Sequence, residues 1–327
     1  MNIKKNYMAL LNGEKPERLV NQYEPFAFVL NEPLLAQTME GRIEGQDAKD
    51  AWGVTMRWKK GDHAGMPYVT DNNKVCPDVC DWRNTVKAPS LDFPEETWQD
   101  AIRVAAAVDR NEYLVTGLMA TGLFERCHFL MGFEDTLMNF LMEPEAMHEL
   151  LDYLLDWRME YAKQLIDHLQ PDAILSHDDW GAKDRLFMSA ETWREFFKPR
   201  YEKLYSYIRN RGVQVIHHAD SYCANIIEDM VDIHIQVWQG VLPDNDIPKL
   251  QRQLNGRMVL MGGINGGVFD FPEWKEEEVR REVRRACNAS KELGGFIPCI
   301  TYGLPETIYP GVFEIIEDEI NIINTEV

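Results

Sequence analysis

The sequence is poor in features that mark secreted or membrane proteins. Its six cysteines include no C-x-x-C pair, and scattered cysteines in a chain of this length are typical of a reduced cytosolic protein. It has no apolar run of about 18 residues, the length that a membrane-spanning helix needs. The first residues, Met1 to Lys5, lack the apolar core of a signal peptide. We therefore expect a cytoplasmic protein that does not cross a membrane.

Basic residues are also scarce. The chain has 34 Lys and Arg against 54 Asp and Glu, which gives a net charge of −20. A surface this acidic repels phosphate backbones and anionic lipids. We therefore expect neither a nucleic acid nor a membrane as partner, and a small molecule or another protein is favoured.

No linker composition divides the chain, so its 327 residues are predicted to form a single domain, 1–327. From about residue 101, apolar runs of strand length alternate with helical patterns. Strands are predicted at 113–117, 173–176, 213–217, 233–238, 258–261 and 295–298, and helices at 98–107, 123–131, 134–141, 144–169, 190–210, 222–231, 247–254, 273–293 and 311–324. Repeated βα units predict a parallel sheet.

The number of these units favours a (β/α)8 TIM barrel, which needs about 250 residues plus insertions. The runner-up is a doubly wound open sheet, but no glycine-rich dinucleotide turn follows the first apolar run, 25–30. Residues 31–100 are irregular and contain several Gly and Pro. We predict that they form an N-terminal cap or hairpin within the barrel domain.

Polar residues follow five of the predicted strands. In a barrel the active site lies at the C-terminal ends of the strands, so this distribution indicates an enzyme. The candidate site residues are Asp178, Asp179, Trp180, His217, His218, Asp220, Gln239, Asn265, Cys299 and Tyr302.

The densest group is His217-His218-Ala219-Asp220 together with Cys299. Imidazole, carboxylate and thiolate suit Zn²⁺, and a catalytic zinc keeps three protein ligands and an open position. Neighbouring histidines in an extended segment face opposite ways, so one of them is expected outside the site. Alternatively, Asp220 or Ser221 caps the helix predicted at 222–231.

Asp178 and Asp179 suggest general acid–base chemistry, because neighbouring carboxylates push their pKa values apart. Adjacent residues of an extended segment point in opposite directions, so we expect one of them to face the site. Either carboxylate is also a candidate metal ligand. Trp180, His217 and Gln239, with Asn265 and Tyr302, are the predicted substrate-binding residues.

At these residues the sequence resembles the uroporphyrinogen decarboxylase superfamily, and within it the branch of cobalamin-dependent methyltransferases. The segments that carry the resemblance are spread over the chain and are more specific in its second half. They are Asn12–Arg18, Asp178–Gly181, Met188-Ser189, Phe197–Pro199, Val215–Asp220, Met261–Ile264 and Gly294–Cys299.

The resemblance implies a zinc-dependent methyltransferase. Those enzymes hold zinc by an H-x-C motif and a distant Cys, which His218 and Cys299 match, while Asp220 stands where the middle Cys would be. The metal is thus expected on His218, Asp220 and Cys299. Asp178 or Asp179 would orient substrate or move a proton.

The methyl group would travel between a small-molecule donor or acceptor and a methylcobamide. The chain contains no D-x-H-x-x-G corrinoid motif, so the methylcobamide is expected on a separate corrinoid protein that docks transiently over the strand ends.

Two alternatives remain open. One is a metal-free decarboxylase of the same superfamily that acts on an unknown small acid. The porphyrinogen reaction itself is disfavoured, because the R-Q-A-G-R segment of uroporphyrinogen decarboxylase is missing. The other is a non-catalytic barrel that binds a methylated ligand or a partner.

Overall fold

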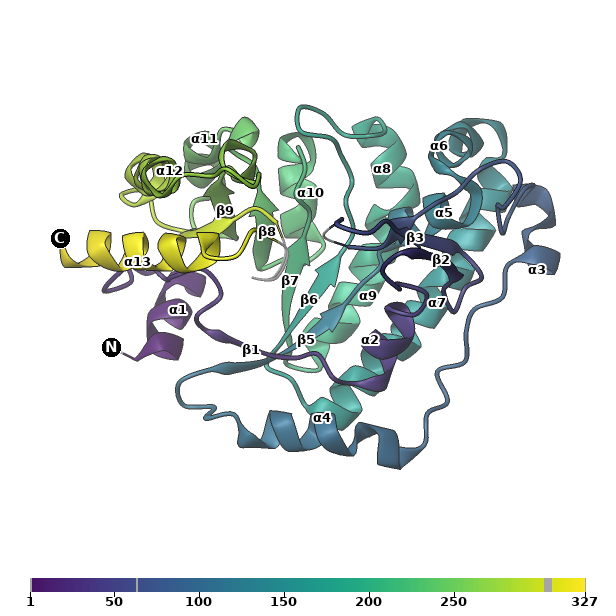
Figure 1. Cartoon of the computed structure of the whole chain (residues 1–327), viewed down its shortest axis with the longest axis horizontal. Coiled ribbons are helices and arrows are strands. Elements are labelled where there is room, and N and C mark those ends of the chain that lie inside the picture. The colour runs from purple at the N-terminus through teal and green to yellow at the C-terminus, as the bar shows by residue number, and fades with distance from the viewer. Residues whose placement is uncertain (1, 63, 303–307, 327) are drawn as a thin grey trace.

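The main element of the structure is a parallel sheet of seven strands in the order β1-β5-β6-β7-β8-β9-β10 (Figure 1). The computed structural model describes residues 2–62, 64–302 and 308–326. The strands are β1 (Phe26–Val29), β5 (Leu114–Met119), β6 (Ala173–His177), β7 (Gln214–His218), β8 (Val237–Val241), β9 (Val259–Ile264) and β10 (Phe296–Ile300).

The sheet curls so that its two edges approach each other. Just ahead of β1, the N–H of Gln22 donates to the carbonyl oxygen of Pro298 (3.3 Å), and its side-chain oxygen accepts from the N–H of Ile300 (3.2 Å). The predicted α/β class and parallel sheet are confirmed. Within the described ranges, however, this sheet has seven strands, one fewer than a complete (β/α)8 barrel.

Helices cover the outer face of the sheet: α7 packs on β5, α9 on β7, α11 on β9 and α13 on β10. Apart from those of the N-terminal cap, the α-helices of the described ranges are α1 (Ile3–Leu11), α4 (Glu95–Ala107), α5 (Leu123–Met131), α6 (Phe133–Met142), α7 (Pro144–Leu169), α8 (Ala190–Phe196), α9 (Lys198–Asn210), α10 (Ile227–Asp232), α11 (Ile247–Leu254), α12 (Glu276–Ser290) and α13 (Val312–Thr325). None of the helices in the described ranges is long and apolar enough to cross a membrane.

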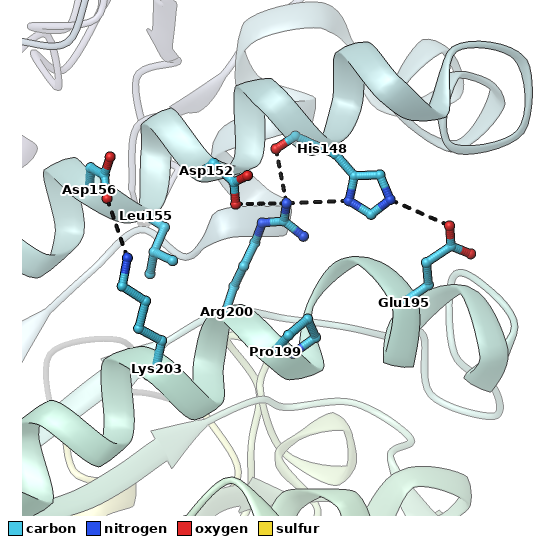
Figure 2. A pocket seen from close by; sticks show the side chains of 8 residues that line it. All are labelled: His148, Asp152, Leu155, Asp156, Glu195, Pro199, Arg200 and Lys203. Carbon is cyan, nitrogen blue, oxygen red and sulfur yellow. Dashed lines mark hydrogen bonds and ion pairs between the residues drawn. The ribbon is translucent and has the colours of Figure 1, made fainter.

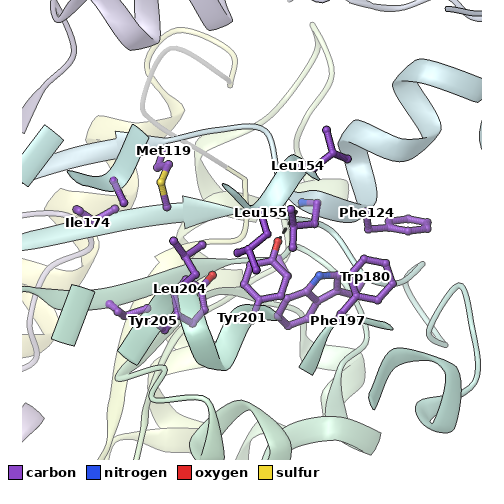
Figure 3. Packing of buried hydrophobic residues seen from close by; sticks show 14 of the residues in the cluster. Met119, Phe124, Leu154, Leu155, Ile174, Trp180, Phe197, Tyr201, Leu204 and Tyr205 are labelled. Atoms are coloured by element: carbon purple, nitrogen blue, oxygen red, sulfur yellow. Dashed lines mark hydrogen bonds between the residues drawn. The ribbon is translucent and has the colours of Figure 1, made fainter. Parts of the chain in front are cut away.

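The core between sheet and helices follows the helical apolar spacing of the sequence. Along α7, buried residues recur every three or four positions, as at Leu151, Leu154 and Leu155, which gives the helix one apolar face. This face meets the aromatic side chains of Trp180 and Tyr201 behind the sheet (Figure 3). Burial of these large rings supplies much of the stabilisation of the outer layer.

The N-terminal cap contains an antiparallel three-stranded sheet, β2 (Gln46–Lys49), β3 (Thr55–Trp58) and β4 (Met66–Pro67), besides the short helices α2 (Pro33–Thr38) and α3 (Trp82–Thr85). Asp50 connects the cap to the barrel through hydrogen bonds and an ion pair. Its carboxylate accepts from the N–H groups of Trp52 (2.9 Å) and Val54 (2.8 Å), and it pairs with Arg126 of α5 (3.2 Å).

Most predicted elements shift by up to three residues at their ends, and three differ more from the structure. The predicted helix 190–210 is interrupted at Phe197, because Pro199 has no N–H to continue the helix. The predicted helix 222–231 begins later, after a 3-10 turn (η2, Ala224–Ile226), so that Ile233 follows α10 instead of opening a strand. The predicted strand 233–238 consequently lies at 237–241.

Candidate functional site

The ends of β6, β7 and β8 place three polar side chains in one row. Strand pairing sets His177 opposite His218, and His218 opposite Gln239. All three line the same cavity. Side chains alternate between the two faces of a strand, so the preceding residues face the helices: Ser176 and His217 both contact Tyr205 of α9.

The cavity has a volume of about 470 Å³, a size suited to a small molecule. Its floor is polar, its walls are largely apolar, and residues from the cap form its roof. The floor comprises Glu125, His177, Asp179, His218, Asp220 and Gln239. The walls are Tyr23, Leu118, Ala120, Thr121, Phe129, Leu175 and Tyr302, and the roof is Met39, Arg42, Met66 and Pro67.

Three of the floor residues can hold a metal ion together. One ligand atom from each of His177, Asp179 and His218 lies within 4.8 Å of the others. Among the residues that the structure describes, this is the one such group of three or more His, Cys, Asp or Glu side chains. Two histidines, one carboxylate and an open side toward a cavity are the donor set of a catalytic metal site.

Both imidazoles are oriented by a second partner. Nδ1 of His177 lies 2.6 Å from a carboxylate oxygen of Glu125, and Nδ1 of His218 bonds to the side-chain oxygen of Gln239. Gln239 is itself fixed, because its amide nitrogen donates to the carbonyl oxygens of Tyr302 (3.1 Å) and Ile300 (3.3 Å). A proton on each Nδ1 directs each Nε2 toward the cavity, where a neutral imidazole can bind a metal, the arrangement typical of metal-binding histidines.

Asp179 completes this arrangement. One of its oxygens accepts from the N–H of Asp220 (3.0 Å), and the other lies 3.9 Å from Nε2 of His177. The rings of His177 and His218 stack with centroids 4.5 Å apart. The two Nε2 atoms and the free Asp179 oxygen therefore belong to one small region at the strand ends.

Burial and neighbouring charges set the protonation of the floor. Burial and the nearby charge of His177 lower the pKa of His218 to about 3, so this imidazole is neutral, as a metal ligand must be. Burial also lowers the pKa of His177, but the negative charges of Glu125 and Asp179 outweigh it and raise the value to about 10, so this ring is protonated at neutral pH and a metal bound at Nε2 would have to displace a proton. Burial raises the pKa of Asp220 to about 6.

The carboxylate of Asp178 is used in hydrogen bonds within the fold and does not face the cavity. It is fully buried and its carboxylate accepts from the N–H groups of Phe124 (3.0 Å) and Glu125 (2.9 Å), the indole N–H of Trp180 (2.9 Å) and the hydroxyl of Tyr201 (2.6 Å). These contacts anchor the first turn of α5, the helix that carries Glu125. Of the two predicted catalytic carboxylates, the structure therefore brings only Asp179 into the cavity.

Gly122 makes this anchoring possible. A Cβ at this position would lie 2.0 Å from the Cβ and Cγ atoms of Asp178, which is far inside van der Waals contact. Only glycine allows the carboxylate to approach the start of α5 so closely.

Two predicted substrate-binding residues lie outside the cavity. Trp180 is completely buried behind the sheet and stacks on the ring of His217, with centroids 4.0 Å apart. His217 is equally buried and has Tyr205 as its hydrogen-bond partner. These two residues belong to the packing between sheet and helices.

Asn265 is likewise placed by backbone contacts. Its side chain accepts from the N–H of Gly267 (3.1 Å) and its own N–H donates to Glu282 (2.9 Å), which closes the turn after β9. It is not among the residues that line the cavity, whereas Gln239 and Tyr302 are.

Of the predicted metal ligands, only His218 belongs to the converging group. Asp220 lines the cavity beside it. Cys299 is fully buried next to Tyr23 and Gln239, its pKa is raised by burial, and it is not a lining residue. The capping alternative for Asp220 and Ser221 is wrong, because neither η2 nor α10 begins with a side-chain cap.

His177, Glu125 and Arg42 are the site residues that the sequence analysis missed. His177 precedes Asp179 by two positions, so the two-residue period of a strand would have placed them on the same face. Glu125 lies 52 residues before His177, and no local pattern links them. Arg42 projects from the cap, donates to the carbonyl oxygen of Gly65 (2.7 Å), and keeps a buried Nε without a partner.

A second hollow, of about 530 Å³, lies on the outer surface between α7 and the helices α8 and α9 (Figure 2). Its charged groups satisfy each other: Arg200 pairs with Asp152 (2.7 Å), and His148 bridges Arg200 and Glu195. It is remote from the strand ends and joins the helices, so we assign it no chemistry.

Comparison with known proteins agrees with the fold. The sequence model of the uroporphyrinogen decarboxylase (URO-D) family matches residues 49–318. A methyltransferase from Methanosarcina mazei has a similar structure, with a TM-score of 0.68 at 14% identity over 99% of both chains. A sugar phosphate isomerase/epimerase from Parabacteroides distasonis is similar only at a TM-score of 0.33, with 11% identity over 74% of this chain and 79% of the other. No curated protein matches the sequence.

Proposed function

The chain belongs to the uroporphyrinogen decarboxylase family, and from that premise we propose that it is a zinc-dependent methyltransferase that works with a separate corrinoid protein. The observation that carries the proposal is the convergence of His177, Asp179 and His218 at the strand ends, with both imidazoles already oriented through Nδ1. The structural similarity to a methyltransferase over the whole chain supports the reaction class.

The metal fits these three residues better than the set expected from the family motif. Cys299 lies outside the converging group, and Asp220 is beside it. We therefore propose His177, Asp179 and His218 as the zinc ligands. Zinc bound there would act as a Lewis acid that holds the methyl donor or acceptor and lowers the pKa of a bound thiol or hydroxyl group.

The remaining cavity residues have separable tasks in this proposal. Glu125 and Gln239 keep both imidazoles in the tautomer that leaves Nε2 free. Asp220, half-buried in the floor, is positioned to receive a proton from the acceptor. The apolar walls, among them Leu118 and Leu175, limit water at the reacting group.

The cavity mouth suits the delivery of a methyl group by another protein. Met39 and Met66 line the cavity and are also 48% and 61% exposed. Exposed apolar side chains at the rim of a pocket are typical of contact surfaces. We propose that the corrinoid protein docks here, over the cap, and presents its methyl group to the cavity.

The test is methyl exchange. Purified protein loaded with zinc is mixed with methylcobalamin, or with a methylated corrinoid protein, and a panel of thiols, and loss of the cobalt–carbon absorbance is followed. We expect demethylation that disappears on chelation and returns with zinc. Absence of exchange with both methylated donors would overturn the methyltransferase proposal.

A metal-free decarboxylase is the second candidate, and one contact favours it. His177 lies between Glu125 (2.6 Å) and Asp179 (3.9 Å), an arrangement that can hold a proton for delivery to a carbanion. Release of CO2 from a panel of small carboxylic acids by chelator-treated protein would support this reaction over methyl transfer.

A further inference from the structure

Arg158 is a buried cation without a carboxylate partner. It lies on α7 and is 2% exposed. By contrast, the buried Arg126 pairs with Asp50 and the buried Arg200 with Asp152. No ion pair involves Arg158 within the described ranges, and burying an unpaired charge is costly. The fold therefore retains this side chain for something other than an ion pair.

The guanidinium group of Arg158 is bound to two strand ends instead. It donates to the carbonyl oxygens of Thr121 and Met119 (3.3 Å), at the end of β5, and to the hydroxyl of Ser176 (2.9 Å), near the end of β6. Thr121 lines the cavity. One side chain on the outer face of the sheet thus fixes two neighbouring strand ends on which the site is built.

The contacts continue to the third strand. The hydroxyl of Tyr205, on α9, donates to Ser176 (3.0 Å) and lies 2.7 Å from Nδ1 of His217. His217 is also stacked on Trp180 and fully buried. Arg158, Ser176, Tyr205 and His217 therefore form one chain of hydrogen bonds behind β6 and β7.

Each strand residue of this chain directly precedes one of the proposed metal ligands. Ser176 comes before His177, and His217 comes before His218. Strand pairing sets Ser176 opposite His217 as it sets His177 opposite His218. Because alternate side chains share one rigid backbone, fixing the outward pair also fixes the direction of the inward pair.

We propose that Arg158 positions the metal ligands His177 and His218 from behind the sheet. This inference rests on the proposed metal site. Arg158 is a positioning residue, since it reaches neither the metal nor the substrate. Residues that orient a metal ligand without touching the metal typically change the affinity for the metal by about 10- to 100-fold. We expect the lower end of that range for a residue that acts through two strands.

The test compares Arg158→Met with Arg200→Met. Both variants remove a buried arginine from the outer helical layer, but the contacts of Arg200 are with Phe196, His148 and Asp152 rather than with strand ends. The dissociation constant for Zn²⁺ is measured by competition with a chromophoric chelator, at a temperature where circular dichroism shows each protein folded. We expect about tenfold weaker binding in Arg158→Met and less than a twofold change in Arg200→Met.

Co²⁺ adds a readout that general destabilisation does not move. Its visible absorption reports the geometry of the ligands, so the spectrum should change in Arg158→Met and stay as in the wild type in Arg200→Met. If Arg158→Met does not fold, Tyr205→Phe removes only the hydroxyl that joins Ser176 to His217. Tyr207→Phe, on the same helix with its hydroxyl bound to Arg211, is its control.

The outcomes separate the two claims. Equal Zn²⁺ affinity and an unchanged Co²⁺ spectrum in Arg158→Met, or in Tyr205→Phe where that variant replaces it, would overturn the positioning role and leave the metal site standing. Wild-type protein that binds neither Zn²⁺ nor Co²⁺ would overturn the proposed function and this inference with it.

Discussion

Asp178 and Asp179 are neighbours in sequence with opposite orientations, and we predict opposite results when each is replaced by alanine. Asp178→Ala should destabilise the protein and leave its metal content intact. Asp179→Ala should remove the metal and leave the stability of the protein nearly unchanged. The pair is a matched comparison, because both changes delete the same carboxylate at adjacent positions.

The magnitude for Asp178 follows from its four hydrogen bonds. Stranding four buried donors at about 2 kcal/mol each costs about 8 kcal/mol. Burial, the main cause that raises the pKa of this carboxyl group to about 6, is costly for a polar group, and removing the group offsets about 3 kcal/mol of that loss. The net loss is about 5 kcal/mol, a large share of the total stability of a typical protein.

The assay is thermal unfolding followed by circular dichroism, together with elemental analysis of the folded protein. For a chain of this size, about 1 kcal/mol lowers the midpoint by about 2 °C, so Asp178→Ala should unfold about 10 °C below the wild type. The carboxylate of Asp179 accepts from a single backbone N–H, that of Asp220, so its loss should shift the midpoint by about 2 °C or less. The reasoning fails if Asp178→Ala unfolds like the wild type, or if it loses its metal while Asp179→Ala keeps it.

Three further predictions follow from single contacts. Gly122→Ala should lower stability by about 1 to 3 kcal/mol, because its Cβ would overlap Asp178; an unchanged unfolding midpoint would refute the close approach. Glu125→Gln should weaken zinc binding by about 10- to 100-fold, because the charged partner of His177 is lost, and equal affinity in a chelator competition would contradict this. Burial raises the pKa of Glu32 from 4.5 to about 7, so the folded state binds the Glu32 proton more tightly than the unfolded state does. The stability that the protonated side chain contributes is fully present below pH 4.5 and is lost as the pH rises through 7. Measured by urea unfolding, the wild type should therefore lose up to about 3 kcal/mol relative to Glu32→Gln between pH 5 and pH 8, and a pH-independent difference would be inconsistent with the raised pKa.

Most of the fold could be predicted because the patterns that mark helices and strands are local features of the sequence. Apolar periodicity placed the long helix 144–169 with the bounds that α7 has. The errors arose where tertiary packing decides. Ile233 and Ile235 are buried in the segment that follows α10, not in a strand. In the sequence, an apolar run this short is the same whether it forms a buried strand or packs next to a helix.

The site was predictable to the level of the strand ends and no further. The alternation of strand side chains correctly implied that one of His217 and His218, and one of Asp178 and Asp179, faces the cavity. Glu125 and Arg42 come from a helix and from the cap, and their approach to the strand ends depends on the tertiary fold. The family motif favoured Cys299 as ligand, whereas the structure brings His177 to the group instead.

Zinc content of two ligand variants and of a Cys299 control variant tests the central claim most directly. We propose that His177, Asp179 and His218 hold the ion, so wild-type protein and Cys299→Ala should each carry about one zinc per chain by elemental analysis. His177→Ala and His218→Ala should be folded and nearly free of zinc. Full zinc in His177→Ala together with its loss from Cys299→Ala would contradict the ligand assignment, and wild-type protein without zinc under loading conditions would contradict the metal site altogether.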